Sequence, residues 1–475
     1  MCPAMKKRNK PLDNRYYLSL EMNFKKQHFL LSAVLGVLTM AACASCGSDN
    51  DEPTPVTPGN PSAGGDEKVE PASTDIIYEA NPRFFAKTGA LREIENQLPR
   101  ISGMGCDVLW LMPIFEPGEV KSVGSPYCIK DYKKINPAYG TDADLKSLIG
   151  KAHSLGMKVI LDWVANHTSF DNTWTTSHPE RYKKDANGNI AATKDWADVA
   201  QLDYSVASTE EGMIDAMEYW VKNFGIDGYR CDYAEGVPHD FWKKAITALR
   251  KIDPKLIMLA ETSQKGFYED GFDMIYDWSF APDLAKAMGK GKIASFVNDA
   301  RTTITSLPEG KSILRYAFNH DVVAENEFDR YFGSADGVKA AYARAAMLGG
   351  TPMIYSGMDA DNVKGKLSFF NYSPLTFSST LTADYSAIDA AYKETADVRG
   401  GTFADFSNGD VAGFTYKANG NTLLVVVNTA NSAKSYRTPI QLSGEVMEDL
   451  LSGSEDKLPV SLDLEPYGYK FYLKR

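Results

Sequence analysis

The 475-residue chain contains little cysteine. It has six cysteines, and those that follow the first 46 residues are Cys106, Cys128 and Cys231. Three widely spaced cysteines do not make a disulfide framework, and they lack the short spacing of a metal site. We therefore expect these three to be buried as small apolar side chains.

Positive charge is also scarce outside the N-terminal segment. The formal net charge is −11, and residues 1–42 carry seven Lys or Arg against two Asp or Glu, so the remainder carries about −16. Such a surface repels phosphate backbones, which argues against nucleic acid and favours a neutral substrate. The hydrophobic fraction of 44% and the charged fraction of 24% exclude a mostly disordered chain, a collagen-like fibre and a multi-span membrane protein.

Long apolar runs are rare too, and the one that is long enough to matter lies near the N-terminus. It covers residues 29–42, follows Lys25 and Lys26, and ends just before Cys43. A basic segment, an apolar segment and small residues before a cleavage site are typical of an export signal. The site resembles a bacterial lipobox with Cys43 as the acylated residue; Cys46 is an alternative, and a plain cleaved signal peptide is another. We therefore expect an exported, membrane-anchored lipoprotein at the outer membrane, the cell surface or the periplasmic face.

The composition divides the chain into four parts. Residues 1–42 are the expected leader and signal peptide, and residues 43–74, rich in Pro, Gly, Ser and acidic residues, are a flexible tether. Residues 75–399 alternate short apolar strands with amphipathic helices. Residues 400–475 predict a C-terminal antiparallel β-sandwich, because strand patterns separated by Asn-Gly turns occur at 411–416, 422–427 and 469–473.

The clearest helix of the central part shows its ends in the sequence. Thr141 can cap it, with Asp144 three residues on, and Gly156 ends it before a buried strand. Apolar residues recur between these ends at helical spacing. The sequence therefore predicts a complete helix-strand unit here.

Repetition of this unit predicts an α/β fold, a (β/α)8 TIM barrel with its active site at the C-terminal ends of the strands. An open doubly wound sheet is the alternative. After strand three, the polar segment 167–205 is too long for an ordinary connection and predicts a small excursion domain at the barrel mouth. The eight strands are expected at 76–80, 108–112, 158–163, 228–232, 256–261, 274–278, 312–318 and 353–356.

Titratable residues gather where strands three, four, five and seven are expected to end: Asp162 and His167, Arg230 and Asp232, Glu261, and His320 and Asp321. A barrel brings all four strand ends to one mouth. Residues two apart in a strand face the same way, so Arg230 and Asp232 share a face. The region contains no arrangement of Ser, His and Asp typical of a catalytic triad, no P-loop and no dinucleotide-binding fingerprint, so no other motif competes with this interpretation.

Two of these carboxyl groups suit different protonation states. Arg230 should lower the pKa of Asp232 and keep it anionic, so that it can attack an electrophilic carbon. Glu261 has no cation next to it in the sequence, so it is the better candidate to hold a proton and deliver it to a leaving group. Two such carboxyls at roughly 5–5.5 Å support glycoside hydrolysis through a covalent glycosyl intermediate.

In order and content, these clusters resemble the signature regions of the α-amylase superfamily, whose members are retaining barrel enzymes active on α-glucans. The resemblance covers roughly residues 75–475. It implies Asp232 as nucleophile, Glu261 as general acid/base and Asp321 as transition-state stabiliser. It implies that Arg230 orients the nucleophile and Asp162 braces this arginine. The residues that it implies around the sugar are His167, His320 and Tyr127, the last as an aromatic platform in the stretch after strand two.

Two departures qualify this resemblance. Starch-degrading α-amylases commonly carry Lys-His three and four residues after the nucleophile, where this chain has Glu235 and Gly236. The stretch 232–242 is instead similar to the neopullulanase and cyclomaltodextrinase pattern. Asn166 matches a ligand of the family's structural calcium site, but Ser205 stands where a ligating acid is usual, and calcium prefers several anionic oxygens.

The resemblance therefore implies a glycosidase that cleaves α-glucosidic, mainly α-1,4, bonds in starch-like glucans or maltodextrins by double displacement. The chemistry requires no cofactor, although the Asn166 match leaves a structural calcium open. The expected partners are an α-glucan or malto-oligosaccharide and, through the N-terminal lipid, a membrane. Two alternatives share the scaffold: a glucanotransferase that passes the same intermediate to a sugar, and a catalytically inactive glycan-binding lipoprotein.

Overall fold

The computed structural model describes residues 75–361 and 363–475. The expected leader, signal peptide and tether, with Cys43 and Cys46, lie outside these residues. Of the described residues, those up to 191 and those from 198 onward belong to one compact unit, and Ala192–Ala197 belong to another. Within Ala192–Ala197, the Thr193 hydroxyl donates a hydrogen bond to the carbonyl of Trp196 at 2.9 Å.

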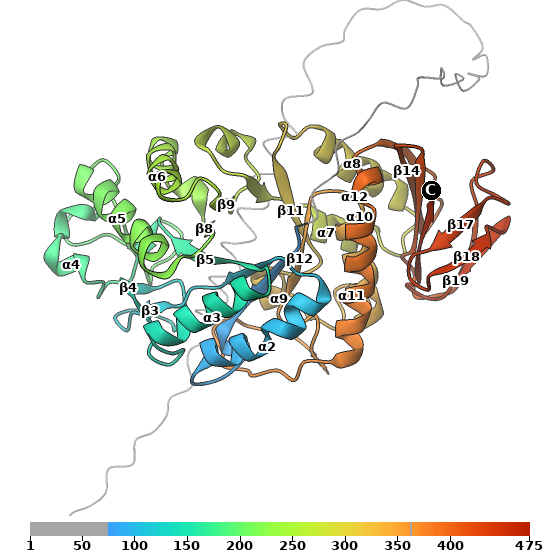
Figure 1. Ribbon diagram of the computed structural model, residues 1–475. Helices are drawn as coiled ribbons and strands as arrows, with labels where there is room; N and C mark the ends of the chain where they lie inside the picture. Colours follow the sequence, from blue (N-terminus) through green and yellow to red (C-terminus); the bar gives the residue numbers. More distant parts are fainter. Residues whose placement is uncertain (1–74, 362) are drawn as a thin grey trace, which may run out of the picture. The chain divides into compact units, whose positions relative to one another are not determined.

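Eight parallel strands close into a barrel in the order β1-β12-β11-β10-β9-β8-β5-β2 (Figure 1). This closure confirms the predicted (β/α)8 fold and rules out the open sheet. The strands read as nearly continuous apolar runs because helices cover them from outside and side chains fill the interior. Their bounds are β1 (Ile77–Ala80), β2 (Val108–Leu111), β5 (Lys158–Val164), β8 (Gly228–Asp232), β9 (Ile257–Ala260), β10 (Met274–Tyr276), β11 (Ser312–Tyr316) and β12 (Thr351–Tyr355).

Helices follow most of the barrel strands. The helix with the clear sequence ends, α3, spans Asp142–Ser154 and begins with a capping box between Thr141 and Asp144, as predicted. It runs beside α2 (Figure 1). The remaining helices are α2 (Ala90–Met104), α5 (Ala207–Phe224), α6 (His239–Ile252), α7 (Phe280–Ala287), α8 (Ile293–Thr305), α9 (His320–Glu325), α10 (Ala335–Met347), α11 (Ser379–Glu394) and α12 (Ala396–Arg399).

Two connections on the carboxyl side of the barrel carry structure of their own. After β2, the strands β3 (Phe115–Pro117) and β4 (Ile129–Ile135) form an antiparallel pair. After β5, the chain forms β6 (His167–Thr168), α4 (Trp174–Ser177), the 3-10 helix η2 (Pro179–Arg181) and β7 (Ala200–Gln201). β6 and β7 pair, so the long polar segment begins and ends on a short two-stranded sheet.

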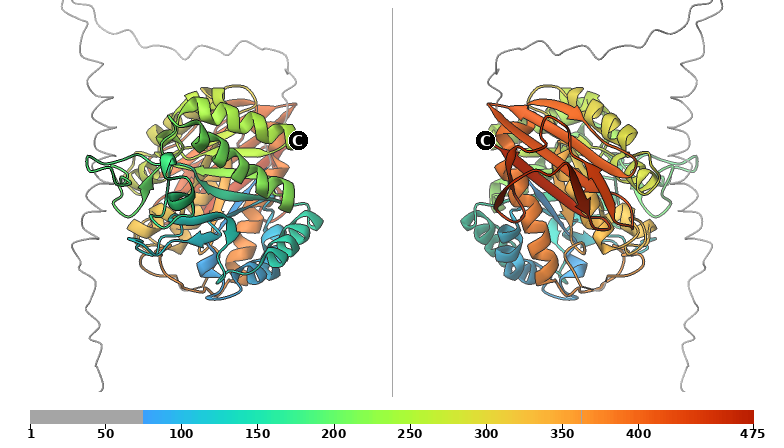
Figure 2. Two further views of the ribbon diagram at one scale, coloured as in Figure 1. Left: turned by 90° about the vertical axis from the view of Figure 1, so that its left-hand side faces the viewer. Right: turned by 90° about the vertical axis from the view of Figure 1, so that its right-hand side faces the viewer.

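The C-terminal part is an antiparallel β-sandwich, as expected. A six-stranded sheet has the order β13-β14-β15-β20-β17-β18, and β16 pairs with β19. The right-hand view of Figure 2 shows the strands of this part in orange to dark red. Apolar side chains from both layers, among them Leu424, Val426, Tyr436 and Leu462, form the core between them. The strands are β13 (Thr402–Asp405), β14 (Val411–Ala418), β15 (Asn421–Asn428), β16 (Lys434–Arg437), β17 (Val446–Asp449), β18 (Ser454–Lys457), β19 (Ser461–Leu464) and β20 (Tyr469–Lys474).

The expectation that the three later cysteines are buried is confirmed within the described residues. Cys106, Cys128 and Cys231 are free thiols and buried. Among the helices between residues 75 and 475 that the structure describes, none has the length and apolar character needed to span a membrane.

Candidate active site

Four acidic residues lie at the carboxyl ends of neighbouring barrel strands. Asp162 lies near the carboxyl end of β5, Asp232 is the last residue of β8, and Glu261 directly follows β9. Asp321 lies in the first turn of α9, which follows β11. The parallel register aligns Asp162 with Arg230 across the β5–β8 pair. The barrel therefore delivers these side chains to one end, as the sequence predicted.

The Arg230 guanidinium joins three of these acids. Its Nη1 lies 2.7 Å from Asp162 Oδ1 and 3.1 Å from Asp232 Oδ1. Its Nη2 forms an ion pair with Glu261 Oε2 at 2.7 Å. Because both carboxylates contact one planar guanidinium, the contacting oxygens of Asp232 and Glu261 lie within about 8 Å of each other, inside the range of glycosidases.

The cation that contacts Glu261 is Arg230, which comes from the neighbouring strand β8. The sequence did not show this contact, because the two residues are not adjacent in it. Arg230 itself is fully buried, whereas the side chains of Asp232 and Glu261 keep exposed fractions of 13% and 14%. The arginine is thus covered, and the two carboxylates it holds face outward, where a substrate can reach them.

Backbone strain accompanies this pair of acids. Tyr233, directly after Asp232, has a φ of 38°, in the left-handed region that non-glycine residues rarely adopt. In this conformation its backbone N–H donates to Glu261 Oε2 at 2.6 Å. A strained residue held between two acids is a common mark of a functional site.

Tyr127 and His320 form a second, aromatic part of the site. Their rings stack with centroids 5.5 Å apart, and the Tyr127 hydroxyl lies 2.8 Å from His320 Nε2. The same hydroxyl donates to Asp162 Oδ2 at 3.0 Å. His320 Nε2 also lies 3.4 Å from Asp321 Oδ2. The structure therefore brings Tyr127, His320 and Asp321 to the acids on Arg230.

His167 and Asn166 lie side by side after β5 and are both buried. The Nδ1 of His167 is 3.2 Å from Asn166 Nδ2. Burial lowers the pKa of His167 to about 4, so the ring is neutral. Burial and the charge of Arg230 also lower the pKa of His320 well below its ordinary value. Both histidines are therefore neutral hydrogen-bonding groups at physiological pH.

The pKa values of the acids differ from the sequence-based expectation. Burial raises the pKa of Asp232 to about 7; Arg230 lowers it, but Asp162 and Asp321 raise it. The expectation that this pKa lies below its ordinary value is therefore wrong, because burial and the neighbouring carboxyls outweigh the lowering by Arg230. Burial likewise raises the pKa of Glu261 to about 8 and that of Asp321 to about 8. The assignment of the ionised form to Asp232 and of the proton to Glu261 stays a prediction.

Sequence reasoning missed Glu79, the last but one residue of β1. It is fully buried, and its Oε1 lies 2.5 Å from His320 Nδ1. Its Oε2 has no hydrogen-bond partner in the described part of the chain. The signal was present in the sequence, since an acid inside an otherwise apolar barrel strand must be neutralised or paired.

Two aromatic residues that hold Arg230 were missed as well. The Tyr276 hydroxyl accepts from Arg230 Nε at 3.1 Å, and the guanidinium carbon lies 5.1 Å from the Trp110 ring centroid. Trp110 Nε1 also donates to Asp162 Oδ2 at 3.3 Å. Aromatic residues are common in barrel strands, so nothing in the sequence marked these two.

The surroundings of Asn166 fit a calcium ion poorly. The side-chain amide nitrogen of Gln201 lies among three oxygens, 3.0 Å from Asn166 O, 3.3 Å from Asn166 Oδ1 and 3.3 Å from Leu202 O. Asp203, two residues after Gln201, accepts a hydrogen bond from the Ser205 hydroxyl at 2.7 Å instead. The described residues contain no cluster of three or more His, Cys, Asp or Glu that could hold a metal. A nitrogen donor thus lies where these oxygens converge.

Two cavities lie away from the acids. One, of about 840 Å³, is at the amino ends of the strands and is bordered by Ile77, Val108 and Thr351. The other, of about 320 Å³, lies between β4, α4 and α5. Neither is lined by the four acids, so they are separate from the candidate active site.

Comparison with known proteins gives a consistent family. A family profile described as "Alpha amylase, catalytic domain" matches residues 65–198. The α-amylase MalA of Haloarcula japonica is 27% identical over 303 residues, which cover 61% of this chain and 44% of that protein. The cyclomaltodextrinase of Geobacillus thermopakistaniensis is 24% identical over 425 residues, covering 82% of this chain and 70% of that protein. The chain thus spans under half of the first relative and about two thirds of the second.

Solved structures agree over most of the chain. An α-amylase from Lactobacillus plantarum has a TM-score of 0.73 and 29% identity, covering 85% of this chain and 99% of that one. The maltogenic α-amylase AmyB from Thermotoga neapolitana has a TM-score of 0.73 and 26% identity, covering 84% and 98%. The similarity therefore includes the barrel and the C-terminal sandwich.

Proposed function

Because the chain belongs to the α-amylase superfamily, with a nucleophile region of the neopullulanase and cyclomaltodextrinase type, we propose that it is a retaining glycosidase of α-glucans. It cleaves α-glucosidic, mainly α-1,4, bonds in starch-like glucans or maltodextrins. The observation that carries the proposal is the pair of carboxylates, Asp232 and Glu261, held by one buried guanidinium. Relatives named cyclomaltodextrinase and neopullulanase support the substrate class.

In the first step, Asp232 attacks the anomeric carbon as Glu261 protonates the departing glycosidic oxygen. The bond to the leaving sugar breaks, and an ester between the glycosyl group and Asp232 forms. The pKa of Asp232, about 7, is lower than that of Glu261, about 8, so the anionic form favours Asp232 and the proton favours Glu261. In the second step, Glu261 takes a proton from water, which attacks the anomeric carbon and releases Asp232.

The other residues stabilise charge or position the sugar. Asp321 is the third acidic side chain and faces the positive charge that develops on the sugar ring. Tyr127 offers its ring below the sugar, and His167 and His320 donate hydrogen bonds to hydroxyl groups. Arg230, braced by Asp162 at 2.7 Å, keeps Asp232 in place. The first and second steps both invert the anomeric carbon, so its configuration is retained.

The test is a product time course on amylose, pullulan and a cyclodextrin, with the anomer of the new reducing end followed by proton NMR. We expect release of α-anomeric sugar from amylose. Asp232→Asn should lower kcat/KM on the order of 10⁴-fold, because it removes the nucleophile. Asp299→Asn on the exposed face of α8 is the matched control and should leave the rate unchanged. Absence of sugar release from every α-glucan, or a β-anomeric product, would overturn the proposal; a profile dominated by longer oligomers would assign the protein to transfer instead.

A further inference from the structure

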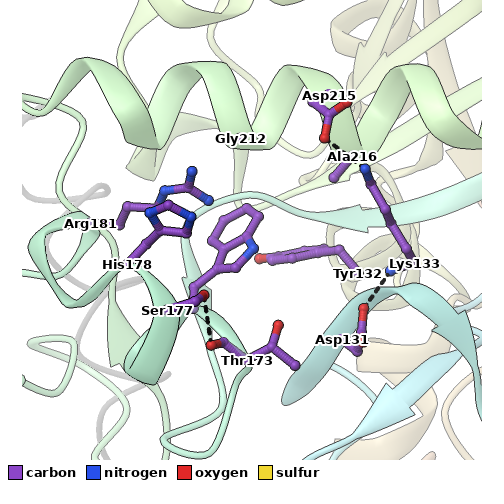
Figure 3. A pocket seen from close by; sticks show the side chains of 11 residues that line it. Asp131, Tyr132, Lys133, Thr173, Ser177, His178, Arg181, Gly212, Asp215 and Ala216 are labelled. Atoms are coloured by element: carbon purple, nitrogen blue, oxygen red, sulfur yellow. Dashed lines mark hydrogen bonds and ion pairs between the residues drawn. The ribbon is translucent and has the colours of Figure 1, made fainter.

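Within the described residues, the cavity of about 320 Å³ between β4, α4 and α5 contains an arginine without an ion-pair partner (Figure 3). Arg181, at the end of η2, has an exposed fraction of only 8%. In the part of the chain that the structure describes, its side chain makes no ion pair within 4 Å, and its Nε is sealed from solvent without a hydrogen bond. A largely buried cation without a contacting anion is costly, so an anion that entered the cavity and contacted this guanidinium would be stabilised.

The position of the guanidinium is fixed by two neighbours. Its carbon lies 4.5 Å from the ring centroid of Trp174, in the cation–π range. On the other side it lies against Gly212 in the interior of α5. A Cβ at Gly212 would come within 2.3 Å of Arg181 Nη1. Glycine inside a helix costs about 1 kcal/mol relative to alanine, so α5 tolerates a weaker residue where the guanidinium needs space.

The other titratable groups around the cavity already have partners. Lys133 binds Asp215 at 2.6 Å, and Asp131 binds Lys134 at 3.3 Å (Figure 3 draws the first pair). His178 lies 3.2 Å from Glu180. Among the residues that line the cavity, Arg181 is therefore the charged side chain without an ion-pair partner. One negative charge in the cavity would balance it.

The field in the cavity limits the charge of the ligand. Burial lowers the pKa of Arg181, while Glu180, Glu211 and Asp215 raise it from beyond ion-pair distance. Those carboxylates would repel a second negative charge on a ligand, which disfavours a dianion such as phosphate. A carboxylate carries one charge, and its planar pair of oxygens matches the fork of a guanidinium.

We propose that this cavity is a binding site for a small carboxylate, either a free organic acid or the carboxylate of an acidic sugar, held by Arg181. The site lies between β4 and the segment that follows β5, and it does not include the catalytic acids. The proposal therefore does not depend on the proposed glycosidase activity, and either can fail without the other.

The test measures binding of acetate, glucuronate, glucose and inorganic phosphate to the whole protein by calorimetry at constant ionic strength. We expect one saturable site per chain for a carboxylate. Binding of acetate and glucuronate indicates a free acid as the ligand, and binding of glucuronate alone indicates an acidic sugar. Glucose, which is neutral, should not bind this site, and phosphate should bind more weakly than the carboxylate.

Gly212→Ala is the decisive variant, because its methyl group displaces the flexible guanidinium and should strengthen α5 instead of unfolding it. We expect at least a tenfold loss of carboxylate affinity. Gly150→Ala in α3 is the matched control, since its Cβ would meet nothing within 4 Å. Arg181→Gln should lose binding as Gly212→Ala does. No saturable binding of either carboxylate up to about 50 mM, equal affinity in Gly212→Ala and Gly150→Ala, or tighter binding of phosphate would each overturn the proposal.

Discussion

Arg230 is one cation among five buried or nearly buried carboxyl groups. Three of them, Asp162, Asp232 and Glu261, contact it, and Glu79 and Asp321 lie close enough to affect the same titrations. A single positive charge cannot keep all of them ionised in a site of low dielectric constant. Protonation is therefore divided among these acids, and the division decides which of them can attack and which can donate a proton.

The first prediction concerns the pH dependence of the proposed activity. Asp232 must be ionised, so kcat/KM should rise as the pH increases through about 7. Glu261 must be protonated, so kcat/KM should fall as the pH increases through about 8. The measurement is kcat/KM for a malto-oligosaccharide across the pH range in which the protein stays folded. The result should be a narrow bell on the alkaline side of neutrality.

An aryl maltoside with a strongly acidic leaving group supplies the control for this prediction. Its departure requires no proton, so the alkaline limb that belongs to Glu261 should weaken while the acid limb that belongs to Asp232 remains. A profile that is flat between pH values of about 5 and 8 for both substrates would contradict the assignment.

The second prediction concerns Glu79. The Tyr127 hydroxyl donates to Asp162, so its oxygen accepts from His320 Nε2–H. His320 is neutral, because burial lowers its pKa, and its Nδ1 therefore carries no proton and must accept from Glu79. Burial raises the pKa of Glu79 well above its ordinary value, which agrees with a protonated acid as the donor. Glu79 then fixes the tautomer whose Nε2–H donates to the Tyr127 hydroxyl and so holds the ring beside Asp321.

Glu79→Gln keeps a neutral donor at this place, and we expect kcat to stay within about threefold of the unchanged protein. Glu79→Ala leaves Nδ1 unpaired and frees the ring, which should lower kcat/KM about 10- to 100-fold. ¹⁵N NMR of histidine-labelled protein measures the tautomer directly, with His320→Asn to identify the signal among six histidines. An imidazolium signal near neutral pH, or equal losses in the two Glu79 variants, would contradict this role.

At the scale of elements, the sequence predicted those helices and strands that a short stretch of their own residues marks. Each barrel strand shows as a short apolar run, and the helix α3 shows its capping residues. The strands of the sandwich that pack on both faces, β14 and β15, were visible for the same reason. β18 was not, because its four residues Ser454–Lys457 are all polar and exposed and carry no alternation.

The same limit applies to the site. The acids could be placed because strand ends converge in any barrel. The pKa of Asp232 could not be predicted, because it depends on Asp162 from β5 and Asp321 from α9. The distances of these two acids from Asp232 are set only when the barrel closes. The link from Glu79 to His320 joins residues 241 positions apart, so no local pattern could reveal it.

The third prediction concerns the excursion segment between β5 and β8. The amide nitrogen of Gln201 joins Asn166 and Leu202, which ties β7 to the end of β5 without a metal ligand set. We therefore expect EDTA to leave the melting temperature and activity of the protein unchanged. Thermal unfolding with EDTA or with added calcium is the measurement.

Gln201→Glu provides the informative variant for this prediction. It replaces the donor by a carboxylate that faces three oxygens, which should cost about 1–3 kcal/mol of stability. Calcium should restore stability in this variant, because the oxygens then include an anion. Gln441→Glu, at an exposed position, should show neither effect. A lower melting temperature of the unchanged protein in EDTA would show that a cation is bound after all.

At the scale of the molecule, the sandwich and the barrel share packing. The face of β14 and β15 that carries Phe414, Tyr416 and Val425 belongs to the same apolar core as the barrel, and the opposite face packs inside the sandwich. The Tyr416 hydroxyl donates to the carbonyl of Met347 at the end of α10. The change of pattern near residue 400 thus marks a change of topology within one continuous core.

The last prediction concerns where the molecule resides, and it depends on residues before 75. The basic and apolar segments and Cys43 lead us to propose that the mature chain is acylated at Cys43 and anchored to a membrane. Cys43→Ala should then move the protein into the soluble fraction or leave it with an uncleaved signal, whereas Cys46→Ala should leave it with the membranes. Cell fractionation, with metabolic labelling by a fatty-acid analogue, measures both.

The reverse pattern would assign acylation to Cys46, and membrane association without label in both variants would contradict lipidation. Because the expected tether separates the cysteine from the first barrel strand, neither variant should change kcat, and a change would indicate that the N-terminal segment contributes to the site.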